Sequence, residues 1–231
     1  MGIIIAIDGP CGSGKGTITK KVQKKLGLVN IDSGSLFRCV TLTAIDNDLD
    51  ETNVEQILKL LDLIDIQIED DGEKDVIYLN GIDVSARIRD FDVSTLVSKI
   101  APIIPLRERM LEFQHKLAYG KNVIIEGRDI GTEVFPNADV KIYLDADVNE
   151  RAKRRHQEYI SNGNYLNFDQ VLESMKQRDS DDFHRPYGAL KQAEDAIYVD
   201  STNMSIDEVV SEIINIIDDK TSFVKDRLDT N

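Results

Sequence analysis

The chemistry suggested by this sequence begins with a glycine-rich stretch, GPCGSGKGT, at Gly9–Thr17. It matches the phosphate-binding pattern G-x-x-x-x-G-K-[ST] at Gly9, Gly14 and Lys15, but Gly16 stands where a hydroxyl residue is expected. Such a loop directs backbone N–H groups toward phosphate oxygens, and the dipole of the following helix favours negative charge there. We expect Lys15 to reach the β- and γ-phosphates of a nucleotide. The alternative is a tight strand–helix turn without a ligand.

The glycine at position 16 changes how a metal ion would be held. A hydroxyl side chain at this position ordinarily ligates Mg²⁺. Without it, we expect Mg²⁺ to rest mainly on nucleotide phosphates, water and nearby acids. Thr17, one residue later, is placed to contact the α-phosphate. The expected ATP-binding residues are Gly9, Pro10, Cys11, Gly12, Ser13, Gly14, Lys15, Gly16 and Thr17.

Two later stretches carry side chains that suit an acceptor substrate. In DSGSLFR, Ser33 and Arg38 lie five residues apart on a turn that enters a helix, and together they can hold a phosphate. The alternative is a helix N-cap by Asp32 or Ser33 beside a surface arginine.

The second stretch, EGRDIGT at Glu126–Thr132, follows an apolar strand. Ligands of open α/β sheets bind at the carboxyl ends of the strands, so these residues should open at the same edge as the glycine-rich loop. Glu126 is placed to hold magnesium-bound water. Arg128 and Asp129 are adjacent and point in different directions, so one can face a phosphate and the other a base. The alternative is a local Arg–Asp pair on the surface.

Arginines gather in the second half of the chain, where they could neutralise a transferring phosphoryl group. No strong general base is needed, because the attacking phosphate oxygen is already anionic. The alternative is ion pairing one helical turn away, by Arg151 with Asp147 and by Arg154 with Glu158. The candidates are Arg151, Arg154, Arg155, Arg178 and Arg185.

Five short apolar runs predict the strands that position these loops. Helical patterns separate most of them, and strand–helix alternation is typical of a parallel α/β sheet. The first helix is expected at about Lys15–Leu26, because Ile18 and Val22 repeat every four residues and Gly27 can cap its end. The strands are expected at residues 3–8, Leu28–Ile31, Val123–Glu126, Val140–Asp145 and Ile197–Asp200.

One region departs from this alternation and predicts a small antiparallel meander, inserted at about residues 60–100. Its isoleucines alternate, and Asn-Gly is the strongest short hairpin signal. The pieces are Ile64–Glu69, the turn Asp71-Gly72, Val76–Leu79, the turn Asn80-Gly81 and Ile82–Val84.

Helix starts are marked by capping boxes at Thr52–Glu55 and Ser205–Glu208, with a weaker version at Asn167–Gln170. Residues 218–231 are charged and weakly patterned, so we expect a frayed tail.

Composition excludes several classes of partner. The 231 residues carry a formal net charge of −14, which opposes binding to nucleic acid or anionic membranes. Two cysteines are too few for a disulfide scaffold and match no zinc pattern. No apolar run approaches a membrane span, and the first residues lack the basic region and the cleavage site that are typical of a signal peptide. We expect a soluble cytoplasmic protein, and a monomer because no exposed apolar stripe demands a partner.

The three motifs together, GPCGSGKGT, DSGSLFR and EGRDIGT, with a β-rich insertion between the last two, closely resemble those of bacterial cytidylate kinase. The resemblance covers about Ile3 to Ile217. It implies the phosphate-binding-loop (P-loop) fold of nucleoside monophosphate kinases: a five-stranded parallel sheet flanked by helices, with the insertion closing over the acceptor and a lid at residues 148–186 closing over ATP.

The resemblance also implies roles for individual residues. Catalysis would use Lys15, Arg128, Arg154, Arg155 and Arg185. The CMP-binding set would be Ser33, Arg38 and Arg128 at the phosphate; Ser98, Arg107 and Asp129 at cytosine; and Arg178, Asp182 and Arg185 at the ribose and lid.

The expected reaction transfers the γ-phosphate of ATP to CMP or dCMP with Mg²⁺. Two alternatives remain at this point: a kinase for another monophosphate such as UMP or AMP, and a nucleotide-sensing module that binds without transfer. The long insertion and the Glu126–Asp129 stretch argue against the first, and the complete arginine set argues against the second.

Overall fold

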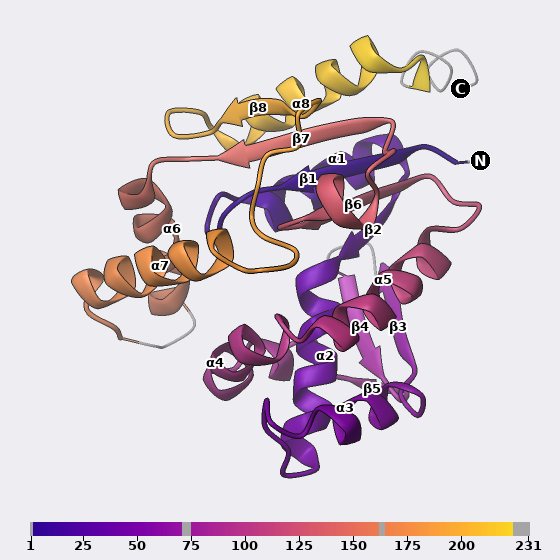
Figure 1. Cartoon of the computed structure of the whole chain (residues 1–231). Helices are drawn as coiled ribbons and strands as arrows, with labels where there is room; N and C mark the ends of the chain where they lie inside the picture. The colour runs from indigo at the N-terminus through magenta and orange to yellow at the C-terminus, as the bar shows by residue number, and fades with distance from the viewer. Residues whose placement is uncertain (1, 71–74, 162–164, 224–231) are drawn as a thin grey trace. The chain divides into compact units, whose positions relative to one another are not determined.

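The computed structural model describes residues 2–70, 75–161 and 165–223, and its elements are labelled in Figure 1. These residues form two compact units. The first contains residues 1–30 and 118–231, and the second contains residues 31–117. The predicted turn at Asp71-Gly72 lies outside the described residues.

The first unit is built on a five-stranded sheet with the order β2-β6-β1-β7-β8, which confirms the predicted parallel α/β architecture. Strands β1, β6, β7 and β8 pair in parallel, with Ile5 opposite Ile124 and Val140. The strand bounds are β1 Ile4–Asp8, β2 Val29–Asp32, β6 Val123–Gly127, β7 Val140–Asp145 and β8 Ile197–Asp200.

Two helices, α1 and α8, pack together against this sheet in one apolar core. Ile18 and Val22 of α1 and Ile213 of α8 are buried in it, as the four-residue repeat predicts. Gly27 ends α1 in the left-handed conformation at φ 57°, which confirms the expected cap. The helix bounds in this unit are α1 Lys15–Leu26, α6 Val148–Ser161, α7 Phe168–Phe183 and α8 Ile206–Lys220.

Helices α6 and α7 form a hairpin that follows β7 along the chain and lies at the carboxyl ends of the strands (Figure 1). A small core joins them through Ala152, Val171 and Met175. A short π-type helical turn, η2 at Ile130–Val134, follows β6. Helix α8 includes Asp218–Lys220, the first three residues of the expected tail, and residues 224–231 lie outside the described part of the chain.

The second unit contains the predicted antiparallel meander, with strand order β3-β4-β5. Its Asn80-Gly81 turn has φ values of 52° and 78°, the two positive angles of a type I′ hairpin. Helices surround it. The bounds are α2 Ser33–Asp46, α3 Val54–Leu61, β3 Ile66–Asp70, β4 Asp75–Leu79, β5 Ile82–Asp83, η1 Arg87–Arg89, α4 Phe91–Ile100 and α5 Ile104–Ala118.

One of the predicted capping boxes is wrong. Helix α3 begins after Asn53, which makes no side-chain cap, and the hydroxyl of Thr52 donates instead to Asp50. A nearer carboxylate in a local turn captures the hydroxyl first. At α8 the box is confirmed, because Ser205 and Glu208 each accept from the other's backbone N–H. At α7, Asn167 caps as expected by accepting from Asp169 N–H.

Candidate nucleotide-binding and phosphoryl-transfer site

The glycine-rich loop joins β1 to α1 in a conformation that requires glycine. A Cβ at Gly9 would lie 2.0 Å from the carbonyl oxygen of Leu144, and Gly14 caps α1 at φ 97°. No acid lies in the first turn of α1, so the helix dipole there is not neutralised from within the helix. The loop therefore has the backbone geometry of an anion site.

Lys15 lies buried at the start of α1 and is turned onto its own loop. Its ammonium donates to the carbonyl oxygens of Gly9 and Pro10, both at 2.8 Å, and to the Ser13 hydroxyl at 3.3 Å. Burial, assisted by the charge of Arg128, lowers the pKa of Lys15 to about 8. Its ammonium is thus held in the loop by three acceptors that a phosphate can replace.

The place of the missing hydroxyl at Gly16 is taken by a carboxylate. A Cβ at Gly16 would lie 3.3 Å from Oε1 of Glu126, which is buried at the end of β6. The hydroxyl of Thr19 donates to the same oxygen at 3.2 Å. Thr17 is exposed. Sequence reasoning missed Thr19, although its position four residues after Lys15 on α1 was a usable signal.

Arg128 and Asp129 follow Glu126 at the same edge of the sheet. The Nε–H of Arg128 donates to Oδ2 of Asp182 on α7 at 2.8 Å. Asp129 is only 5% exposed, so the alternative of a surface Arg–Asp pair is wrong. The partner of Arg128 could not be predicted from the sequence, because Asp182 lies 54 residues away.

Asp182 links two of the predicted arginines. It is 1% exposed and also pairs through Oδ1 with Arg185. Burial raises its pKa most, but the charges of Arg128, Arg185 and Arg178 together outweigh burial and leave the pKa below its usual value. The structure therefore brings these four residues of the predicted set together.

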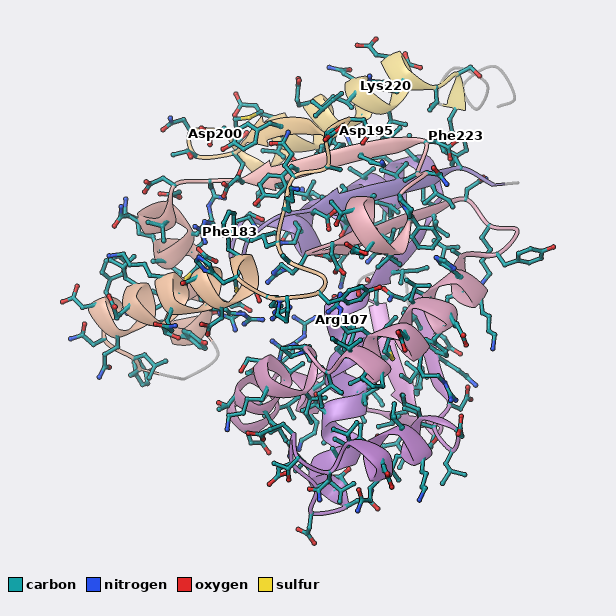
Figure 2. All side chains as sticks on the ribbon, viewed as in Figure 1. Arg107, Phe183, Asp195, Asp200, Lys220 and Phe223 are labelled. Carbon is teal, nitrogen blue, oxygen red and sulfur yellow. The ribbon has the colours of Figure 1, made fainter. Side chains whose placement is uncertain are left out.

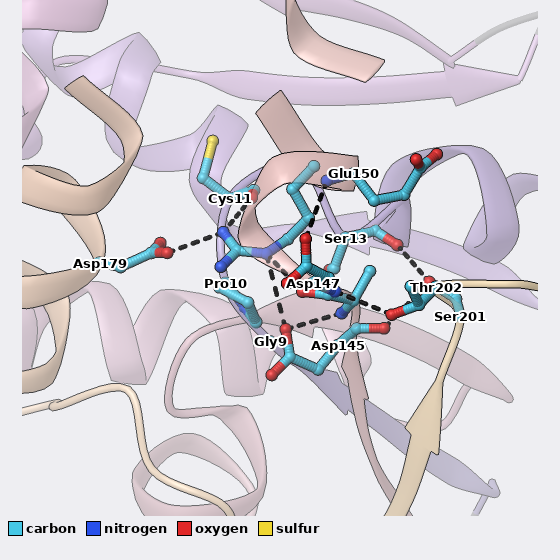
Figure 3. Close-up of polar contacts among 12 residues, drawn as sticks. Gly9, Pro10, Cys11, Ser13, Asp145, Asp147, Glu150, Asp179, Ser201 and Thr202 are labelled. Atoms are coloured by element: carbon cyan, nitrogen blue, oxygen red, sulfur yellow. Dashed lines mark hydrogen bonds and ion pairs between the residues drawn. The ribbon is translucent and has the colours of Figure 1, made fainter. Parts of the chain in front are cut away.

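Arg151 connects the glycine-rich loop to the α6–α7 hairpin through Cys11 of the loop and Asp179 of α7, which are both labelled in Figure 3. Its guanidinium donates to the carbonyl oxygens of Ala146 and Cys11, at 2.9 and 3.0 Å, and pairs with Asp179 of α7 at 2.7 Å. The alternative that Arg151 pairs with Asp147 is wrong, because that carboxylate accepts backbone N–H groups at the start of α6.

The alternative that Arg154 pairs with Glu158 is also wrong. Arg154 pairs with Glu150 at 3.3 Å and donates to the carbonyl oxygen of Ser201 at 2.8 Å. Glu158 instead pairs with Arg155 at 2.8 Å. Arg155 lies three residues before Glu158 and competes for it, while Glu150 offers Arg154 a partner one turn earlier.

Positive charges around the loop lower the pKa of the Cys11 thiol. Burial alone would raise its pKa, yet the pKa is lowered. The charges responsible are those of Arg178, Arg128, Arg155 and Lys15, in that order. Four cations from separate elements thus act on one point of the loop, within a protein whose net charge is −14.

In the second unit, the start of α2 holds the predicted phosphate-binding pair. Ser33 is buried, and Asp32 caps the helix by accepting from Ser35 N–H at 3.0 Å, so the N-cap part of the alternative is correct. Arg38 is half-buried, and its guanidinium donates to the Ile88 carbonyl oxygen at 3.0 Å and to the Ser94 hydroxyl at 2.8 Å.

The predicted base-reading residues of this unit lie on α4 and α5. Arg107 is buried on α5, where it donates to the carbonyl oxygen of Ala101 at 3.2 Å and lies 5.5 Å from the centroid of the Phe37 ring (Figure 2). Ser98 is exposed on α4, and its hydroxyl donates to the Thr95 carbonyl oxygen. The aromatic contact fixes the plane of the Arg107 guanidinium.

The parallel sheet, with a glycine-rich loop and a buried lysine between β1 and α1, defines a P-loop protein of the α/β class. A structural comparison supports the fold alone. An uncharacterized protein from Eubacterium ventriosum matches with a TM-score of 0.50 and 16% identity, over 94% of this chain and 98% of that one.

The chain belongs to the cytidylate kinase family, whose model matches residues 5–219. It is 43% identical over 214 residues to the cytidylate kinase of Caldicellulosiruptor saccharolyticus, covering 93% of this chain and 95% of that protein. It is also 43% identical over 223 residues to that of Fusobacterium nucleatum, covering 96% and 99%. The resemblance drawn from the three motifs is confirmed.

Proposed function

We propose that this protein transfers the γ-phosphate of ATP to CMP or dCMP, giving ADP and CDP or dCDP. The observation that carries the proposal is the buried Lys15 ammonium on the glycine-rich loop, where Arg151 also donates to the carbonyl oxygen of Cys11. Membership of the cytidylate kinase family indicates that CMP is the acceptor.

On the donor side, the loop residues Gly9–Thr17 bind the ATP phosphates. Lys15 exchanges the carbonyl oxygens of Gly9 and Pro10 for β- and γ-phosphate oxygens. Arg128, Arg154, Arg155 and Arg185 stabilise the charge of the transferring group, which is the main requirement of phosphoryl transfer. A general base is not required, because the acceptor oxygen is already ionised.

Magnesium, when bound with ATP, would neutralise the charge of the β- and γ-phosphates. The residues present fit it. Glu126 supplies a buried carboxylate beside Gly16, and Thr19 orients this carboxylate by a hydrogen bond. A single carboxylate suits an ion that keeps several waters and phosphate oxygens as ligands. We infer that Glu126 holds magnesium-bound water, as the sequence suggests.

On the acceptor side, Ser33, Arg38 and Arg128 would bind the phosphate of CMP. The Asp129 carboxylate would accept from the exocyclic amine of cytosine, while Arg107 would donate to the ring acceptors and Ser98 would supply a further contact to the base. Uracil would leave a buried carboxylate unpaired, at a cost of about 1–3 kcal/mol.

The ribose would be bound by Arg178, Asp182 and Arg185. Asp182 already holds Arg128 and Arg185, so substrate hydroxyls would join an existing ion-paired group. We further propose that residues 60–100 close over CMP and residues 148–186 over ATP, which would exclude water from the reaction.

A coupled assay with ATP and a panel of nucleoside monophosphates tests the function. CMP and dCMP should have the highest kcat/KM, with ADP and CDP formed in equal amounts. A higher kcat/KM for AMP or GMP would overturn the acceptor assignment. Nucleotide binding without formation of ADP and CDP would identify a sensing module instead.

A further inference from the structure

Asp8 is a buried carboxylate that the proposed chemistry does not use. It ends β1, is 4% exposed and directly precedes the glycine-rich loop. Its Oδ1 accepts from the backbone N–H of Ile130 at 2.8 Å, and its Oδ2 accepts from that of Gly131 at 2.7 Å. These amides lie more than 120 residues away in the sequence, so the contact is a specific product of the fold.

The two amides open the π-type turn η2, which comes directly after Arg128 and Asp129. Asp129 stands at the cap position of this turn but makes no side-chain cap there. Asp8 performs that task from a neighbouring strand instead. The turn is thus capped from β1 and not by Asp129, although Asp is among the best capping residues.

The approach of Asp8 to this turn is close enough to constrain the residue type opposite it. A Cβ at Gly131 would lie 3.4 Å from Oδ2 of Asp8 and 3.2 Å from Cδ of Lys141. Burial raises the pKa of Asp8 to about 6, while its two amide hydrogen bonds and Lys15 oppose that rise and Asp129 adds to it. At neutral pH the group is ionised and accepts two charge-assisted hydrogen bonds.

We propose that Asp8 is a positioning residue for acceptor recognition: it fixes the turn after β6 so that Arg128 and Asp129 present their side chains to the monophosphate. This inference rests on the proposed function for its substrate. Asp8 itself touches neither nucleotide. Its influence passes through the amides of Ile130 and Gly131.

The test is the Asp8→Asn variant, whose amide can accept from one of the two N–H groups but turns its own donors toward the other. The KM for CMP should rise roughly ten- to a hundredfold, as expected for losing a hydrogen bond to a charged group. The KM for ATP should change by less than about threefold, because the Lys15 ammonium is held by acceptors of its own loop and not by Asp8. Asp139→Asn is the matched control, since Asp139 also accepts a β1 backbone N–H, from Ile4, but is exposed.

A second readout does not depend on catalysis. Amide hydrogen exchange at Ile130 and Gly131 should accelerate in Asp8→Asn and stay unchanged in Asp139→Asn, even where the wild-type protein makes no CDP. Should Asp8→Asn fail to fold, Asp8→Glu keeps the charge while displacing both oxygens, and it should show the same selective CMP defect. Unchanged exchange at both amides, or a lower kcat with both KM values unaltered, would overturn the proposal.

Discussion

Lys15 offers the sharpest test at the level of single residues. The Lys15→Ala variant should lose nearly all activity, because no other side chain in the described loop brings a positive charge to the β- and γ-phosphates. It should retain a cooperative thermal transition, since only three hydrogen bonds within one loop are lost. Lys21→Ala is the matched control, because Lys21 lies on the same helix but pairs at the surface with Asp207. Full activity in Lys15→Ala would contradict the assigned role.

The protonation of Lys15 predicts a pH dependence. Its pKa in the free protein is about 8, so the ammonium is lost as the pH rises through that value. The kcat/KM for ATP should therefore fall above about pH 8, since this ratio reports the free enzyme. Bound phosphates favour the ammonium, so the fall in kcat should occur at higher pH. A Lys15→Arg variant should not show this fall in kcat/KM near pH 8, because arginine stays protonated. The same fall in both proteins would show that another group titrates.

At this scale the sequence predicts residue types better than contacts. Lys15, Gly14 and Asp32 could be assigned because their partners lie within a few residues. The Arg151–Asp179 and Arg128–Asp182 pairs could not, since the acids lie 28 and 54 residues away on a different helix. The contact of Asp8 with η2 joins residues more than 120 positions apart, and no local pattern encodes it.

At the level of elements, the capping boxes expected at Ser205 and Thr52 should differ in how much they contribute to the free energy of unfolding. Ser205→Ala should lower the free energy of unfolding by about 1 kcal/mol, because it removes the cap of α8, whose apolar face lies in the main core. Thr52→Ala should cost clearly less, because Thr52 does not cap α3. Denaturant titrations of both variants compare them directly, and equal losses would show that the structure misassigns one of these helix starts.

The elements themselves were predictable wherever hydrophobic periodicity was strong. Strands β7 and β8 and helix α1 have the bounds expected from the sequence, because apolar repeats and glycine caps specify them locally. The η2 turn was not anticipated. The N–H groups of Ile130 and Gly131 are satisfied by Asp8 of another strand, so Asp129 precedes the turn without capping it, although Asp is a common capping residue.

At the scale of the whole molecule, nucleotide binding should stabilise the fold. A non-hydrolysable ATP analogue at about a hundred times its Kd contributes roughly 2.7 kcal/mol by mass action, which corresponds to a rise in Tm of roughly 5–10 °C for a chain of this size. Scanning calorimetry measures the shift. Lys15→Ala should show almost none, whereas Lys21→Ala should match the wild type, and an equal shift in all three would place the analogue elsewhere.

The whole chain carries a net charge of the same sign as its substrates. Its net charge of −14 opposes the approach of anions, so the local arginines must reverse the sign of the potential near the loop.

Among the described residues, no helix is long and apolar enough to cross a membrane.

The position of the Lys15 ammonium on its own loop makes nucleotide binding an exchange reaction. The carbonyl oxygens of Gly9 and Pro10 already satisfy this cation, so an incoming anion gains only the difference between its own contacts and those it displaces. A monovalent anion of low charge density gains little by this exchange. A triphosphate gains much more, because it meets the loop amides and several arginines at once. Binding at this loop should therefore favour ligands that bring several phosphates at once over small single anions.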